Sequence, residues 1–133
     1  MPRIKNSNRV FLKRTVDAYH NHKRRAEKCR ALLDYTLEDL RELIGVSLGD
    51  GCPYCGTTLN PASFQLDHKD PISRGGLHSI TNITACCRPC NEAKGNMDHD
   101  EFKTLLAAIT HFSHEARVGI LSRLRIGGKM MRR

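Results

Sequence analysis

Aromatic residues are scarce in this chain of 133 residues, which has no tryptophan, three tyrosines and four phenylalanines. A chain this short forms one domain with appendages rather than two full domains. So few large side chains provide only a small hydrophobic core, and small cores are often stabilised by a disulfide or a bound metal. The six cysteines could supply such a link.

Long apolar runs are also absent. The longest stretch near the C-terminus without Asp, Glu, Lys or Arg spans residues 104–114, well short of the roughly 18 apolar residues that a membrane span needs. Neither an apolar run nor a small-residue cleavage site follows the basic start, so we expect no secretory signal. We therefore expect a cytoplasmic, intracellular protein with no membrane partner, in which paired cysteines more often bind metal than form disulfides.

The net charge of +8 is unevenly distributed. Residues 1–30 carry a net charge of +8, residues 31–116 of −6 and residues 117–133 of +6. Such basic segments are commonly solvated faces or tails, and the alternative is an arm that binds a polyanion. Nucleic acid suits this arm better than a membrane surface, because it lacks the broad apolar face of an interfacial helix. Within it, Arg24 and Arg25 are our candidate nucleic-acid contacts.

The spacing of apolar residues predicts helices on both sides of a loop-rich middle. Apolar residues three or four apart predict helices over about 10–33, from Thr36 to Gly45, from Asp98 onward, and from Ser113 to Gly127. Thr36 and Asp98 each have an acidic residue three positions later, which is the pattern of a capping box.

The middle of the chain has the composition of a compact, loop-rich module. Residues 51–96 contain glycine, proline and cysteine around two short β-prone runs, 63–68 and 80–86. We therefore expect an α+β fold with three segments. These are a basic helical N-terminal extension over 1–50, a core over 51–97, and C-terminal helices with a basic tail over 98–133.

Four of the cysteines form two CxxC pairs, Cys52 with Cys55 and Cys87 with Cys90, separated by 31 residues. Each pair can bind one metal ion from a tight turn, and together they complete a tetrahedral thiolate site of the kind that holds structural zinc. Such a closed site has no open coordination position, so we expect it to hold the fold rather than to perform chemistry.

A second ligand set combines the first CxxC pair with His68, as in a Cys2His2 finger. His78 then lies too far along the chain to be the fourth ligand, and the second CxxC pair would have no function. Chance spacing of ordinary thiols is the remaining alternative. We expect Cys29 and Cys86 to be buried thiols without a metal.

Between and just after the cysteine pairs lies a group of polar residues in a fixed order. The sequence Asp67-His68-Lys69-Asp70-Pro71 precedes a Gly75-Gly76 turn, then Asn82, and the last cysteine opens the sequence Cys90-Asn91-Glu92-Ala93-Lys94. This order resembles the HNH endonuclease family of the ββα-metal fold, over about residues 51–97 or a third of the chain.

Residue chemistry agrees with this resemblance. Hydrolysis of a phosphodiester needs a base that deprotonates water and a cation that offsets charge on the phosphate. His68 has the ordinary pKa range of such a base, and Asp67 and Asn91 offer the hard oxygen ligands that suit Mg²⁺ or Mn²⁺. Taken singly, an Asp-His pair most often lies on the surface without a catalytic function, and an Asn usually stabilises a turn.

The resemblance implies a role for each position. His68 is the general base, Asn82 orients it and braces the loop, and Asp67 and Asn91 hold the catalytic ion. Lys94 and Arg74 are weaker candidates for contacts with phosphate. The remaining histidines match no motif position and are expected to be exposed or core residues; they are His20, His22, His78, His99, His111 and His114.

We therefore predict a metal-dependent endonuclease that hydrolyses DNA, most readily double-stranded DNA, and leaves 5′-phosphate and 3′-hydroxyl ends. One such site nicks one strand, so a double-strand break needs a homodimer or a larger phage or mobile-element complex. The alternative is a non-catalytic zinc module that binds nucleic acid through its basic ends, and a structural role in protein interaction comes third.

Overall fold

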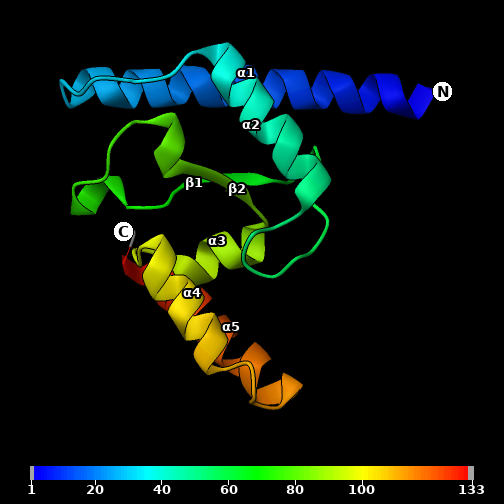
Figure 1. The fold of residues 1–133 in the computed structure, drawn as a ribbon, viewed down its shortest axis with the longest axis vertical. Coiled ribbons are helices and arrows are strands. Elements are labelled where there is room, and N and C mark those ends of the chain that lie inside the picture. The colour runs from blue at the N-terminus through cyan, green and yellow to red at the C-terminus, as the bar shows by residue number, and fades with distance from the viewer. Residues whose placement is uncertain (1, 132–133) are drawn as a thin grey trace.

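The computed structural model describes residues 2–131, with the side chains of residues 9–126. Figure 1 shows a small two-stranded sheet between two groups of helices, with α1 and α2 on one side and α3, α4 and α5 on the other. The elements in chain order are α1 (Pro2–Lys28), α2 (Leu37–Asp50), β1 (Gln65–His68), β2 (Ile83–Cys86), α3 (Arg88–Lys94), α4 (His99–Ala108) and α5 (His114–Met131). The expected α+β class is confirmed.

The two strands pair in an antiparallel arrangement, so the start of β1 lies beside the end of β2. Gln65 lies opposite Cys86, and His68 lies opposite Ile83. Two short 3-10 turns, Ile72–Arg74 and Ile80–Asn82, lie in the connection between the strands. The register places His68 at the end of β1, where the chain leaves the sheet.

Both predicted capping boxes are present. The Thr36 side chain accepts a hydrogen bond from the Asp39 backbone, and the Asp39 carboxylate accepts one from Thr36 N–H. Asp98 and Glu101 make the same reciprocal pair at the start of α4. Each cap satisfies backbone N–H groups that the first helical turn would otherwise leave without partners.

Several predicted boundaries are wrong. The first helix ends at Lys28 rather than near residue 33, because Arg30 adopts a positive φ and the chain then becomes extended. The second continues past Gly45 to Asp50 and ends at Gly51, whose φ of 89° favours glycine. The last continues past Gly127 to Met131. The strands are shorter than the β-prone runs that predicted them.

One hydrophobic core joins all three expected segments. Tyr35, Leu40 and Ile44 pack with Phe64 and Ile83 of the central module, and Phe102 of α4 closes the same cluster with no exposed surface. Cys86 is buried in this core as expected, whereas Cys29 is exposed, so the prediction of a buried Cys29 is wrong. None of the described helices is long and apolar enough to span a membrane.

We expect Phe102→Ala to lower the free energy of unfolding by about 3–5 kcal/mol, because it empties a fully buried site in a small core. Phe112 is half exposed beyond the end of α4, so Phe112→Ala should cost about 0.5 kcal/mol or less. Chemical denaturation of the two variants measures the difference. Equal losses of stability would show that the core is not centred on Phe102.

Candidate metal centre and active site

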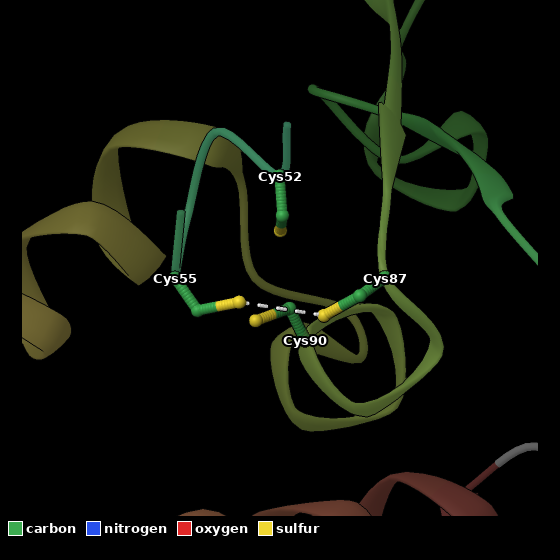
Figure 2. Close-up of side chains that lie close together, drawn as sticks. All are labelled: Cys52, Cys55, Cys87 and Cys90. Atoms are coloured by element: carbon green, nitrogen blue, oxygen red, sulfur yellow. Dashed lines mark hydrogen bonds between the residues drawn. The ribbon is translucent and has the colours of Figure 1, made fainter. Parts of the chain in front are cut away.

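The four cysteine sulfurs lie within 4.8 Å of one another. Figure 2 shows Cys52 and Cys55 on the turn that follows α2, with Cys87 at the end of β2 and Cys90 in α3. The Sγ atoms of Cys55 and Cys87 are 3.6 Å apart. Four thiolates around Zn²⁺ at a Zn–S distance of about 2.3 Å lie about 3.8 Å apart. The cluster therefore fits a zinc site.

The local backbone explains how each pair converges. Around the first pair, Gly56 N–H donates to the carbonyl of Cys52, and Cys52 N–H donates to the carbonyl of Thr57, so the chain turns tightly. Gly56 adopts a φ of 77°, which favours glycine. Cys87 caps the N-terminus of α3, so Cys90 lies one helical turn later on the same side.

The thiols differ in the ease of losing a proton. A hydrogen bond with Cys90 lowers the pKa of Cys52, and the same contact raises the pKa of Cys90, so Cys52 is the member of this buried pair that loses its proton first. Cys86, one residue before the third ligand, behaves in the opposite way, because burial raises its pKa well above the ordinary value. Burial also raises the pKa of Cys87. Zinc binds thiolates, so the metal must displace the protons that Cys87 and Cys90 hold, and Cys86 remains a neutral core residue.

Asp67 and Lys94 form an ion pair beneath the end of β1. The Lys94 side chain is 1% exposed, and its Nζ atom lies 2.8 Å from Asp67 Oδ2. Nζ also donates to the backbone carbonyl of His68 at 3.1 Å. The expected contact of Lys94 with a phosphate needs an exposed ammonium group. In this structure the group instead holds Asp67 and the backbone of His68.

His68 lies half-buried between two other histidines. Its ring centroid is 5.2 Å from that of His22 in α1 and 5.7 Å from that of His78. Burial lowers the pKa of His68 to about 4, with smaller contributions from His22, His78, Arg25 and Lys94. The imidazole is therefore uncharged at neutral pH, which is the form that can accept a proton.

Asn82 braces the loop that leaves His68. Its Nδ2 atom donates to the carbonyls of Asp70 and Leu77, and its Oδ1 accepts from Asp70 N–H. The backbone carbonyl of Asn82 also accepts a hydrogen bond from Lys69 N–H. At Gly76 a Cβ atom would overlap the Asp70 carbonyl oxygen, so the same loop needs glycine. Asn82 thereby fixes the chain just after His68.

Asn91 lies half-buried in α3, one residue after the last cysteine of the cluster. Helix α3 packs against β1, so Asn91 and Asp67 come from adjoining elements. A carboxylate and an amide oxygen are hard ligands of the type that Mg²⁺ and Mn²⁺ prefer. The donor types on these two elements therefore fit a divalent ion.

Arg74 is engaged within the protein. Its guanidinium donates two hydrogen bonds to the Glu101 carboxylate, at 2.9 and 2.8 Å, and a longer one to the carbonyl of Asn96. Both Arg74 and Glu101 stay partly exposed. This ion pair links the loop after β1 to the start of α4. The Glu101 carboxylate also neutralises the positive charge with which Arg74 would attract a phosphate.

Helix α1 places basic side chains close to His68. Arg24 and Arg25 are exposed on α1, and the charge of Arg25 contributes to the lowered pKa of His68. A cleft of about 270 Å³ separates α1 from β1, and Arg14, Asn21 and Arg25 lie along it. On the side of β1 the cleft is lined by the first residues of that strand, Gln65 and Leu66. On the side of α1 it includes His22, whose ring contacts that of His68.

Three residues near the site were not identified as functional candidates from the sequence. His22 and His78 contact His68, and Arg14 stacks over the ring of Phe64 while donating to the carbonyls of Pro61 and Phe64. These contacts join residues far apart in the chain, and no motif spacing signals them. One hint was available: Thr15 and His22 fall at helical spacing with the apolar residues Phe11, Ala18 and Ala26 of the first helix.

Residues 52–97 match the family model described as HNH endonuclease. Two relatives are CRISPR-associated endonucleases Cas9. The protein from Corynebacterium diphtheriae is 35% identical over 46 residues, which cover 34% of this chain and 4% of that protein. The protein from Actinomyces naeslundii is 41% identical over 49 residues, which cover 36% of this chain and 4% of that protein. The chain is thus similar to a small part of each much longer protein.

We expect Cys52→Ser to lose most of the bound zinc, because three thiolates cannot complete the tetrahedral site. Cys29→Ser is the matched control, since Cys29 is exposed and lies outside the cluster. Metal analysis of the purified proteins should find about one zinc per chain in the wild type and in Cys29→Ser. A Cys52→Ser protein with the same zinc content would refute the assignment.

Proposed function

We propose that this chain, whose residues 52–97 form an HNH endonuclease domain, hydrolyses DNA phosphodiester bonds with the help of a divalent ion. One observation carries the proposal: His68 lies at the end of β1, with Asp67 before it in the chain and Asn82 bracing the loop that follows. In this proposal the flanking segments, residues 1–50 and 98–133, support that domain and bind the substrate.

In the proposed reaction, His68 accepts a proton from a water molecule as the water oxygen attacks phosphorus. The bond between phosphorus and the 3′ oxygen breaks, and that oxygen leaves as a hydroxyl after taking a proton from solvent. The products are a 5′-phosphate and a 3′-hydroxyl end. A divalent ion, Mg²⁺ or Mn²⁺, held by Asp67 and Asn91 would supply positive charge that offsets the charge building on the phosphate.

The other residues of the site hold these groups in place. The buried ion pair with Lys94 fixes the Asp67 carboxylate, and the same ammonium fixes the backbone carbonyl of His68. Three side-chain hydrogen bonds of Asn82 hold the loop after His68. The zinc cluster joins the start of α3, which carries Asn91, to the turn after α2. A site fixed in this way loses little energy to reorganisation during the reaction.

The basic helix α1 supports nucleic acid as the substrate. The central segment, residues 31–116, carries a net charge of −6 and would attract DNA poorly by itself. Arg24 and Arg25 project from α1 into solvent, and Arg25 lines the cleft beside β1. We propose that double-stranded DNA lies along α1 with one phosphate at His68.

The proposal has two further consequences for the protein in the cell. One site cuts one strand, so a double-strand break needs a homodimer or a larger complex with a second nuclease. Thiolates that bind zinc persist in a reducing compartment, so we propose an intracellular location.

We expect the zinc-loaded protein to nick supercoiled plasmid in the presence of Mg²⁺ or Mn²⁺, and His68→Ala to lower the rate by about 100-fold or more, because the general base is lost. His111→Ala removes an exposed histidine and should cut like the wild type. Gel analysis of nicked and linear product measures both rates. Plasmid binding without cutting by the wild type would instead support the non-catalytic zinc module.

We expect Arg25→Gln to weaken DNA binding and to reduce the slope of log affinity against log salt by about 1, as the loss of one phosphate contact does. Lys103→Gln removes an exposed charge from α4, away from α1, and should leave that slope unchanged. Fluorescence anisotropy with a labelled duplex at several salt concentrations gives the slopes. Equal slopes for the two variants would show that the bound DNA does not lie along α1 at Arg25.

A further inference from the structure

The ring of His68 has little hydrogen bonding to hold it. Its Nε2 atom is buried and has no hydrogen-bond partner among the described residues. The Lys94 contact holds the backbone of His68 and leaves the ring unconstrained. A general base must point one ring nitrogen at the water that it activates, so its ring orientation must come from packing. The residues that pack against the ring therefore affect how well His68 can act as the general base.

Two histidines supply that packing from opposite parts of the chain. His22 of α1 is 8% exposed, and its ring is tilted by 45° against that of His68 at a centroid distance of 5.2 Å. His78 is 5% exposed and meets the same ring edge-on, at 5.7 Å and 81°. The His68 ring thus contacts one histidine from the N-terminal helix and one from the loop between the strands.

The short extended segment at Asp34 and Tyr35 holds both of these partners. The Tyr35 hydroxyl lies 2.5 Å from Nδ1 of His22, and the Tyr35 ring packs edge-on against the His22 ring. The preceding residue, Asp34, donates its backbone N–H to the carbonyl of His78 at 2.8 Å. Tyr35 is itself 6% exposed within the core. Movement of this segment would therefore shift both side chains that flank His68.

Burying a histidine at position 22 costs free energy unless its ring nitrogens form hydrogen bonds. Burial opposes its charged form and lowers the pKa of His22 to about 4, with smaller contributions from Arg25 and His78. The other buried residues on this face of α1 are the small Thr15 and Ala26. An apolar side chain would fill the same space without losing hydration. The hydrogen bond to Tyr35 is the specific gain that a histidine provides here.

We propose that His22, held by Tyr35, is a positioning residue that sets the ring orientation of His68. The inference rests on the proposed role of His68 as the general base. It places part of the nuclease site in α1, outside the matched residues 52–97. In this role His22 acts through its contact with the ring of His68, even though it also lines the cleft between α1 and β1.

The experiment compares His22→Leu and Tyr35→Phe with His20→Leu, an exposed position on the same helix. Plasmid nicking is measured with zinc-loaded protein over a range of DNA concentrations. His22→Leu should lower the rate at saturating DNA by at least about 10-fold, because a misplaced base reacts slowly. The DNA concentration for half-maximal rate should stay within about twofold, because the basic side chains of α1 proposed to bind phosphate are kept. Tyr35→Phe should lower the saturating rate in the same direction, and His20→Leu should match the wild type.

A spectroscopic readout separates positioning from a general loss of structure. Ring signals of His68, recorded by NMR on zinc-loaded protein without DNA, should differ between the wild type and Tyr35→Phe, because the His22 ring that packs against His68 loses the hydrogen bond that holds it. Tyr35→Phe removes one oxygen atom and keeps the ring, so it carries the test if His22→Leu fails to fold. Zinc content and melting temperature identify folded variants.

Each outcome bears on a different claim. If His68→Ala abolishes nicking while Tyr35→Phe and His22→Leu cut like the wild type, the positioning role is wrong and the nuclease assignment stands. If the wild type does not cut with any divalent ion, the nuclease assignment is wrong, and the NMR comparison still tests positioning. Unchanged His68 ring signals in Tyr35→Phe would overturn the inference in either case.

Discussion

The rest of the structure depends on the convergence of four sulfur atoms from two distant turns. Residues 56–86 lie between the two CxxC pairs and contain both strands and the loop that connects them. These elements are short, and the strands pair over only four residues each. A two-stranded sheet of this size is not stable by itself in water. A metal ion bound by both pairs would fix the two ends of the segment and remove much of the chain entropy that otherwise opposes its folding.

Buried polar contacts also stabilise the segment between the two cysteine pairs and the start of α3. Lys94 is among the most buried side chains in the described part of the chain, and it stabilises the fold only because Asp67 and the His68 carbonyl meet its ammonium group. Asn82 uses both its donor and its acceptor on the loop after β1. These contacts converge on the end of β1, so the groups that stabilise this region are also those that orient the proposed catalytic residues. In the proposed mechanism, the contacts that stabilise the end of β1 are thus the same contacts that position the base.

Local chemistry accounts for what the sequence predicted well. The capping boxes at Thr36 and Asp98 involve residues three positions apart, and the metal site follows from CxxC spacing; both are short-range patterns. Helix ends were predicted poorly, because the glycines at 45 and 127 are tolerated inside helices that tertiary packing supports.

Contacts between distant parts of the chain could not be read from the sequence. Lys94 was expected on the surface, where a lysine usually lies, and its burial depends on a partner 27 positions earlier. The contact of His22 with His68 depends on the path of α1 across the end of β1. No periodicity encodes such a path. The motif therefore predicts the centre of the candidate site, and the tertiary structure was needed to find the residues that contact it.

The chemistry of the cut ends tests the central claim most directly. A nicked plasmid made by the zinc-loaded protein with Mg²⁺ can be treated with a DNA ligase, which joins a 5′-phosphate to a 3′-hydroxyl end and no other combination. The account predicts nicks that the ligase reseals, and that form only when a divalent ion is present. Nicks that the ligase reseals only after a 3′-phosphatase and a 5′-kinase have acted carry 3′-phosphate and 5′-hydroxyl ends, and they would contradict attack by water with departure of the 3′ oxygen.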